Sequence, residues 1–286
     1  MFWQQLINGL VTGSVYALVA LGYALIYGVL GLINLAQGEL YMAGAFALWL
    51  GITFLQLPLT LAIPFGLGIA ALVGLGMERI VFRPLKNRHP LIPLLAAIGL
   101  SIFLQSLALL LFGPETKPFA ASITPHIWDF GVFTISNLQL TLMLTALGLM
   151  LGLLWYVHST RQGQALQAVA IDPEAARLVG IKPDLCVAQA FAIGAMLSGA
   201  AGMMMAAYYN ATYPYMGVLP GLKGFCAAVL GGAGSIGGAI LGGILLGLSE
   251  NLGAAYISSG FKDGFAFALL VLILIFRPQG ILGKKK

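Results

Sequence analysis

Long apolar stretches follow one another along almost the entire chain, and they constrain its fold more than any other feature. A helix needs about 20 mostly apolar residues to cross the hydrocarbon core of a bilayer. Only 8% of the residues are charged, whereas soluble globular domains contain about 25% charged residues. The chain is therefore expected to be an all-α, polytopic membrane helical bundle.

The apolar runs predict about eight or nine transmembrane segments, of which two are atypical. One is short and contains Lys223, which favours a re-entrant helix, and the first is long enough to be broken near Gly28 or Gly31. The candidate segments are 5–33, 38–57, 60–76, 91–112, 138–158, 185–209, 217–230, 236–257 and 264–276.

Basic residues gather in three places, which orients the bundle. They lie between the third and fourth segments, in the polar stretch 159–184 and at the C-terminus, and the positive-inside rule assigns all three to the cytoplasm. The connection 113–137 is then external, and an odd number of spans puts the N-terminus outside. The basic residues are Arg79, Arg83, Lys86, Arg88, Arg161, Arg177, Lys182, Arg277, Lys284, Lys285 and Lys286.

The start of the chain has no basic region before its first apolar run and no small-residue cleavage site after it. A cleavable signal peptide normally shows both features. The first apolar segment is therefore expected to remain in the protein.

The polar stretch 159–184 contains a short helix with clear signals at both ends. Asp172 can cap the free backbone N–H groups, Pro173 suits the first turn, and Glu174 suits the positive end of the helix dipole. Arg177 suits the last turn, and Gly180 can adopt the left-handed conformation that ends helices.

The predicted helix, 173–179, is too short to be stable alone, because in water even about 12 to 15 residues are marginal. Its stability must come from packing through a small apolar face. That face consists of Ala175, Ala176, Leu178 and Val179. The pattern is typical of an element that docks onto another protein.

A second polar group, in the sequence INLAQGEL, follows the first long apolar run. Polar residues at membrane depth are costly and usually face the bundle interior or a substrate path. We therefore interpret this group as part of an interrupted helix beside a transport path. Its residues are Asn34, Gln37, Gly38 and Glu39. A plain connection between two spans remains an alternative interpretation.

Lys223 and Glu250 are the charged residues of two adjacent apolar segments. Both fall in the outer halves of their segments, at depths that a lysine side chain can bridge. A structural ion pair is the favoured interpretation, and a direct role in transport is the alternative.

The sequence offers little support for catalysis or metal binding. Histidines and cysteines are few, and none has the spacing of a metal site or an activated nucleophile. They are His89, His126, His158, Cys186 and Cys226. We predict no catalytic residues and no metal site, and we interpret the cysteines as small buried side chains.

The sequence GAGSIG at 232–237 matches the glycine pattern of dinucleotide-binding folds. No strand precedes it and both flanks are apolar spans, so a turn between two helices is the better interpretation. The phosphate-binding pattern GxxxxGK[ST] is absent from the sequence. We therefore expect no cofactor on this chain, and any use of ATP must occur on another subunit.

Three sequences together resemble one known family. They are NGLVTGSVYALVALGYALIYGVLGLINLAQGELYMAGAF near the N-terminus, GQALQAVAIDPEAARLVGI in the polar stretch and FRPQGILG near the C-terminus. This set is similar to the permease subunits of branched-chain amino-acid ABC importers, a family that also includes urea and short-amide permeases. The resemblance extends over essentially the whole chain.

The resemblance implies one permease domain over residues 1–286, in a bacterial inner membrane, with the C-terminus in the cytoplasm. It implies a second homologous permease, two cytoplasmic ATPases that use ATP and a periplasmic substrate-binding protein as partners, together with membrane lipid and no nucleic acid. Stretch 159–184 corresponds to the loop that couples the permease to an ATPase. The matching positions are Asp172, Pro173, Glu174, Ala175, Ala176, Arg177 and Gly180, and Leu178 is expected to contact the ATPase.

The implied function is import of branched-chain or related hydrophobic amino acids by ATPase-driven alternating access. A urea or short-amide importer is an alternative within the family. An ATP-independent secondary transporter is a third possibility, but it gives no reason for the short cytoplasmic helix. Because selectivity in such importers belongs to the binding protein, the substrate does not follow from this chain.

Overall fold

The computed structural model describes residues 2–86, 88–89, 91–118, 126–129, 131, 133–277 and 279–283. Within these residues the chain is almost entirely helical, with one two-stranded hairpin. The α-helices are α1 (Phe2–Leu30), α2 (Gln37–Thr53), α3 (Leu59–Met77), α4 (Arg83–Leu85), α5 (Leu91–Phe112), α6 (Asn137–Ser159), α7 (Arg161–Ile171), α8 (Pro173–Leu178), α9 (Pro183–Tyr209), α10 (Val218–Gly231), α11 (Ile236–Tyr256) and α12 (Lys262–Phe276).

Three shorter elements complete the described chain. A π-helix, η1 (Glu78–Phe82), joins α3 to α4, and a 3-10 helix, η2 (Ser259–Phe261), precedes α12. Strands β1 (Ile127–Asp129) and β2 (Thr134–Ser136) pair antiparallel. This hairpin lies in the connection predicted at 113–137, of which residues 119–125, 130 and 132 fall outside the described residues.

The predicted membrane bundle is confirmed. In the described part of the chain, 7 helical stretches are long and apolar enough to cross a membrane. They are Phe2–Leu30, Leu59–Leu85, Leu91–Phe112, Asn137–Ser159, Pro183–Tyr209, Ile236–Tyr256 and Ser259–Phe276. Helices α2 and α10, with 17 and 14 residues, are shorter and account for the other two predicted segments.

Helices α1 and α9 form the centre of the bundle, and most of their side chains are buried. Helix α1 packs most extensively on α11, and α9 packs on α1, α2 and α3. Helices α5 and α12 lie at the periphery and leave large apolar side chains uncovered by the protein, such as Leu110 and Phe276. Such surfaces are expected where a bundle meets lipid or another membrane subunit.

Glycine allows helices to approach one another closely in the bundle. At the crossing of α1 and α11, a Cβ added to Gly247 would collide with the backbone of Gly13. Lipid provides no hydrophobic drive for helices to associate, so small residues that let backbones approach are the usual basis of packing in membranes.

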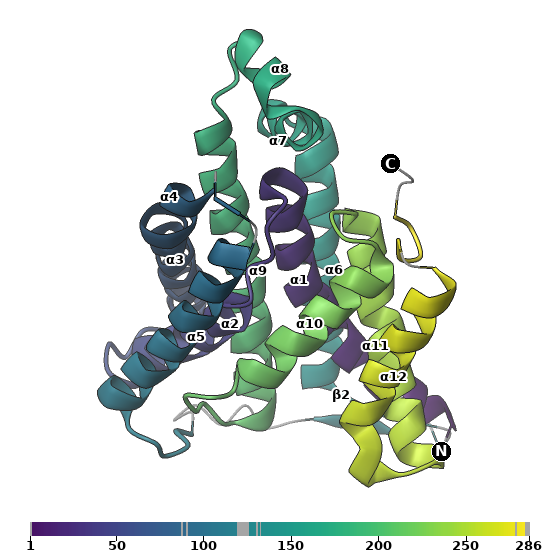
Figure 1. Cartoon of the computed structure of the whole chain (residues 1–286). Helices are drawn as coiled ribbons and strands as arrows, with labels where there is room; N and C mark the ends of the chain where they lie inside the picture. The colour runs from purple at the N-terminus through teal and green to yellow at the C-terminus, as the bar shows by residue number, and fades with distance from the viewer. Residues whose placement is uncertain are drawn as a thin grey trace.

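The two ends of the bundle differ in composition. Helices α4, α7 and α8 and the C-terminus lie at one end, and the N-terminus lies at the other (Figure 1). The basic residues of α4, α7 and α8 thus lie at one end, whereas Lys284, Lys285 and Lys286 fall outside the described residues. The two ends of the chain lie at opposite ends of the bundle, as an odd number of membrane crossings requires.

The first segment was expected to be broken near Gly28 or Gly31, and the structure places the break at Gly31. Helix α1 continues unbroken through Gly28 and ends at Leu30, so no break occurs near Gly28. A single glycine costs a helix interior only about 1 kcal/mol, which is too little to break a long apolar helix. The interruption begins at Gly31, which adopts a left-handed φ of 68°.

The polar stretch 159–184 is more helical than the sequence pattern indicated. Residues Arg161–Ile171 form α7, a helix that the sequence analysis did not identify. Helix α8 has six residues instead of the expected seven, because Val179 leaves the helical conformation. The expected turn at 232–237 is present, with left-handed φ angles at Gly232 and Gly234.

Candidate functional site

Helix α8 begins where the sequence indicated and ends one residue earlier than expected, at Leu178. Asp172 Oδ1 accepts hydrogen bonds from the backbone N–H groups of Glu174 at 2.8 Å and Ala175 at 3.0 Å. Gly180 has a left-handed φ of 85°, and its N–H donates to the carbonyl of Arg177 at 3.0 Å. The chain thus closes this short helix at both ends without help from another element.

The apolar residues of α8 divide between two directions. Ala176 is buried and faces the bundle, whereas Leu178 is 90% exposed and Val179 is 74% exposed. Ile171, at the end of α7, is 86% exposed. The expected single docking face therefore separates into an anchor at Ala176 and an uncovered apolar tip, which we call the α8 tip (Ile171, Leu178 and Val179).

Helix α7 provides the support that α8 needs. Its buried side chains Leu166 and Val169 face the bundle, and α7 contacts α6, α9 and α1. Thr160 caps α7 by accepting a hydrogen bond from the N–H of Gly163 at 3.0 Å. Because α8 packs on both α7 and α9, its position follows the position of these helices.

The base of α9 is tied to the α3–α4 end of the bundle. Lys86 forms an ion pair with Asp184 in the first turn of α9. Nearby, Arg83 lies 3.4 Å from the buried carboxylate of Glu78, and the ring of Phe82 packs against Phe191 at 5.1 Å. These contacts link α8, through the start of α9, to a second membrane-spanning stretch.

The interrupted helix of the sequence INLAQGEL lies deep in the bundle. Gln37 Nε2 donates to the carbonyl of Gly194 at 3.0 Å and to Ser198 Oγ at 2.8 Å. Gly194 is roughly 17 Å along α9 from Pro183, given a rise of 1.5 Å per residue. Helix α2 therefore begins near the middle of the bundle, and residues 31–36 connect it to the end of α1.

Asn34 completes this polar network. Its Nδ2 donates to Gln37 Oε1 at 3.2 Å, and its Oδ1 accepts from the N–H of Ala36 at 3.1 Å. Both side chains are buried. Gly38 then packs so closely on Gly217 that a Cβ at either position would collide with the other backbone. The non-helical connection is thus held on α9 and α10.

Glu39 belongs to a different environment from Asn34 and Gln37, although all three are close in sequence. Its Oε1 accepts hydrogen bonds from Ser101 Oγ at 2.8 Å and Gln105 Nε2 at 2.7 Å, both on α5. Its Oε2 is buried and has no hydrogen-bond partner. The structure therefore brings Asn34 and Gln37 together on α9 and turns Glu39 toward α5.

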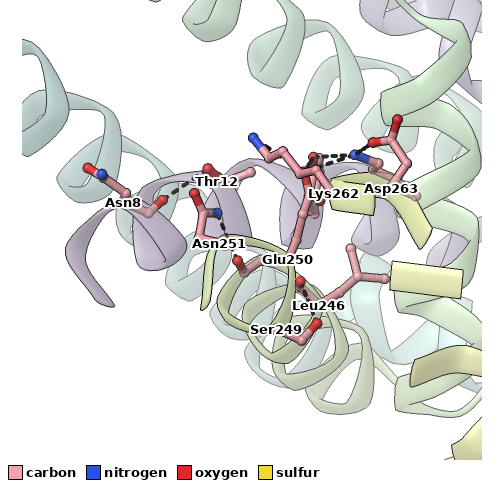
Figure 2. A network of polar contacts seen from close by, with 11 residues as sticks. Asn8, Thr12, Leu246, Ser249, Glu250, Asn251, Lys262 and Asp263 are labelled. Atoms are coloured by element: carbon pink, nitrogen blue, oxygen red, sulfur yellow. Dashed lines mark hydrogen bonds and ion pairs between the residues drawn. The ribbon is translucent and has the colours of Figure 1, made fainter. Parts of the chain in front are cut away.

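Lys223 and Glu250, which are both buried, meet in a cluster of charges whose other members, Lys262 and Asp263, are about half exposed. Lys223 Nζ lies 2.9 Å from Glu250 Oε1 and 2.5 Å from Asp263 Oδ1. Lys262 lies 3.5 Å from Glu250 Oε1. Figure 2 shows Glu250 on α11 with Lys262 and Asp263 at the start of α12.

Tyr16 of α1 completes the cluster. Its hydroxyl donates to Glu250 Oε1 at 3.3 Å, and Lys223 Nζ approaches the same hydroxyl at 3.3 Å. The expected pair is therefore part of a network that joins α1, α10, α11 and α12. Each charge has an opposite charge nearby, as buried charges generally require.

Several partners of these residues were missed by the sequence analysis. Ser101 and Gln105 are four residues apart in a mostly apolar segment, a helical spacing that could have indicated a polar face on α5. Lys262 and Asp263 directly precede the predicted last segment. Tyr16 and Ser198 carried no such signal, because one hydroxyl in an apolar helix is common.

Among the residues that the structure describes, no three His, Cys, Asp or Glu side chains are grouped so that they could hold a metal ion. Cys186 and Cys226 are both buried and free. The polar chemistry of the described chain is therefore concentrated in the α8 region, the interrupted helix and the charge cluster.

A multi-span helical bundle with an interrupted helix at mid-depth and a capped short helix at one end defines a membrane protein of the transporter class. Residues 5–274 match the family described as branched-chain amino acid transport system / permease component. The chain belongs to this family.

Individual relatives agree with this membership. The high-affinity branched-chain amino acid transport system permease protein BraD of Pseudomonas aeruginosa is 40% identical over 99% of this chain and 96% of its own length. The corresponding LivH protein of Escherichia coli is 39% identical over the same shares. A probable LivH protein of Methanocaldococcus jannaschii is 25% identical over 96% of this chain and 91% of its own.

Proposed function

We propose that this chain is the transmembrane permease subunit of a binding-protein-dependent ABC importer for branched-chain or related hydrophobic amino acids. Its family membership and the names of its relatives support this function. They do not favour a urea or short-amide importer or an ATP-independent transporter. In this proposal the chain transports and does not act as an enzyme.

The observation that carries the proposal is the exposed α8 tip on a capped, six-residue helix. Leu178 and Val179 are apolar side chains that the described protein leaves uncovered beyond the membrane-spanning helices. Exposed apolar residues rimmed by polar ones are typical of protein interaction sites. Asp172, Pro173, Glu174, Ala175, Ala176, Arg177, Leu178 and Gly180 would form or shape the surface that meets a cytoplasmic ATPase.

The remaining partners follow from the importer function. We infer two ATPase subunits that bind and hydrolyse ATP, a second homologous permease and a periplasmic substrate-binding protein. This chain would bind no cofactor of its own. The α8 end and the C-terminus would face the cytoplasm, and the N-terminus would face the outside of a bacterial inner membrane.

The proposed mechanism transmits ATPase motion along α9. Closure of the ATPase pair would move α8 and the base of α9, which are joined by the short connection Val179–Lys182. Helix α9 would carry the movement to the interrupted helix through the hydrogen bonds that Gln37 makes to Gly194 and Ser198. Rigid-body movement of helical units is a common basis of alternating access.

Site-directed crosslinking tests the proposal. Cysteine replaces Leu178 in one variant and Ala176 in a matched control, because these residues of the same helix are 90% and 3% exposed. A thiol crosslinker is expected to join the Leu178→Cys permease to an ATPase subunit and to leave the Ala176→Cys permease unlinked. Absence of any crosslink from Leu178, in a complex that still hydrolyses ATP, would contradict the docking role.

A second experiment separates coupling from membrane insertion. Scrambling residues 172–177 is expected to abolish uptake while the protein still inserts, because membrane insertion depends on the apolar segments. Unchanged uptake by the scrambled variant would refute the role of α8.

A further inference from the structure

We propose that a groove between α3, α6 and α9 binds an acyl chain of an anionic phospholipid, and that basic residues at the α8 end of these helices bind the lipid's phosphate group. We call it the lipid groove. It is lined by Leu67 of α3, by residues within 148–156 of α6 and by residues within 193–197 of α9. This inference goes beyond the proposed function, and its test does not depend on transport.

The first observation is the size and openness of the lipid groove. Helices α3 and α6 both pack on α9, and the space between the three helices has a volume of about 380 Å³. A Cβ added at Gly148 or Gly152 would meet nothing within 4 Å. A dry apolar cavity of about 150 Å³ already holds benzene. The lipid groove therefore has room for a segment of a flexible hydrocarbon chain.

The second observation is the depth of the lipid groove. On α6 its lining begins with Gly148, roughly 17 Å along the helix from Ser159 at the end of α6, and reaches Tyr156, roughly 5 Å from that end. One leaflet is about 15 Å thick, which is half of the hydrocarbon core. The lipid groove thus lies in the leaflet that borders the α8 end of the bundle.

Polarity increases along the lipid groove toward the α8 end. The lining residues are apolar apart from Tyr156. The hydroxyl of Tyr156 donates to Gln162 Oε1 of α7 at 3.0 Å. A phospholipid has the same order of groups, because its acyl chain lies in the membrane and its headgroup lies at the surface.

The third observation is the charge at the α8 end of the lipid groove. Each of the three lining helices has a basic residue where it reaches this end: Arg79 follows α3, Arg161 follows α6 and Lys182 precedes α9. All three are exposed. Among the described residues, none of the three forms an ion pair.

Other basic residues near this end already have acidic partners. Arg83 is paired with Glu78, and Lys86 is paired with Asp184. Because η1 and α7 both contact α9, the ends of the three lining helices lie near one another. Basic pockets between transmembrane helices are typical binding sites for anionic lipid headgroups. The three unpaired cations complement a lipid phosphate in this way.

A transmembrane helix of another subunit fits the lipid groove less well than a lipid does. A spanning helix needs a groove across both leaflets, about 30 Å. The lining on α6 extends over only eight residues, roughly 12 Å. A lipid without net charge would fill the same space but would gain little from the basic residues. The charge therefore favours an anionic phospholipid.

The test measures lipid binding to the permease purified in mild detergent, together with the subunits that it retains. Phosphatidylglycerol and phosphatidylcholine with identical acyl chains are added separately, and native mass spectrometry gives the affinity of each. Phosphatidylglycerol is expected to bind more tightly, by roughly fivefold for each basic residue that it meets. Equal affinities for the two lipids would overturn the proposal.

Charge variants locate the headgroup. Arg161→Gln and Lys182→Gln should each lower the affinity for phosphatidylglycerol by roughly fivefold and leave that for phosphatidylcholine unchanged. Arg88→Gln is the matched control, because Arg88 is exposed but belongs to none of the three lining helices. An equal loss in Arg88→Gln would indicate general attraction to surface charge and would overturn the site.

A glycine variant tests the place of the acyl chain. Gly152→Leu should fill part of the lipid groove and lower the affinity for phosphatidylglycerol by roughly tenfold, the equivalent of about two buried methylene groups. Gly76→Leu is the control, since Gly76 of α3 also has open space around it but does not line the groove.

Two results with Gly152→Leu would overturn the site. One is an unchanged affinity for phosphatidylglycerol, and the other is loss of a retained subunit, which would assign the groove to a protein helix. If Gly152→Leu fails to insert into the membrane, the comparison of Arg161→Gln and Lys182→Gln with Arg88→Gln still decides the question.

Discussion

Lys223 Nζ of α10 lies 2.9 Å from Glu250 Oε1 of α11, and both side chains are buried. This contact holds the short helix α10 against one of the full-length spans. Asp263 and Lys262 extend the contact to α12, and Tyr16 extends it to α1. One cluster of charges therefore joins α1 to three consecutive helices near the C-terminal end of the described chain.

Removing Lys223 should destabilise the protein strongly. Lys223→Met leaves the buried carboxylate of Glu250 without its closest cation, and breaking a buried ion pair costs about 3 to 5 kcal/mol. Adding Glu250→Gln should recover part of the loss, because the unpaired charge disappears. Thermal unfolding of the purified permease in detergent measures both effects.

Lys262→Met is the control for this experiment. Lys262 is 44% exposed and lies 3.5 Å from Glu250, so its loss should cost about 1 kcal/mol or less. Equal destabilisation by Lys223→Met and by the double variant would show that the two residues do not stabilise the protein as a pair.

Replacing Gln37 should loosen the interrupted helix. Gln37→Leu removes the hydrogen bonds to Gly194 and Ser198 and also leaves Asn34 Nδ2 without its acceptor, which should cost about 2 kcal/mol. Ser198→Ala removes only one of these hydrogen bonds and should cost about 1 kcal/mol. Thermal unfolding gives the order of the two variants, and a larger loss for Ser198→Ala would contradict the proposed anchoring by Gln37.

Loss of the Asp172 cap should weaken the coupling of ATP hydrolysis to transport more than it affects insertion of the permease into the membrane. Asp172→Ala removes the acceptor for two N–H groups, a change that costs a helix about 1 kcal/mol. We expect less substrate transported per ATP hydrolysed, with unchanged amounts of permease in the membrane. Asp172→Asn, which retains a capping oxygen, should restore most of the coupling; failure of Asn to do so would indicate that the charge, and not the cap, is required.

The membrane segments were predictable because the apolar runs correspond directly to buried or lipid-facing helices. Segment 91–112, for example, matches α5 at both ends. Helix α7 was missed because its polar residues dominate the composition of the stretch, whereas its burial depends on the spacing of Leu166 and Val169. The capping roles of Asp172 and Gly180 depend only on neighbouring residues in the sequence. The ends of α8 could therefore be predicted to within one residue.

The contacts of the polar residues were harder to predict, because they depend on tertiary packing. Glu39 meets Ser101 and Gln105 across 62 and 66 residues of sequence. Asp263 reaches Lys223 only because η2 and the start of α12 bring it back to the first half of α10. A sequence pattern shows which residues are costly to bury in a membrane. It does not show which helix provides their hydrogen-bond or ion-pair partners.

The contact of α1 with α11 gives a further prediction, because it depends on the absence of side chains. A Cβ at Gly247 would collide with the backbone of Gly13, so Gly247→Ala must push the two helices apart. Overpacking of this kind typically costs about 1 to 3 kcal/mol, and more where backbone must move.

By contrast, a Cβ at Gly148 on α6 meets nothing within 4 Å. Gly148→Ala should therefore be neutral or stabilising by up to about 1 kcal/mol through helix propensity alone. Thermal unfolding of the two variants compares the same substitution at two glycines in membrane-spanning helices. Equal stability of the two variants would contradict the close approach of α1 and α11 on which the centre of the bundle depends.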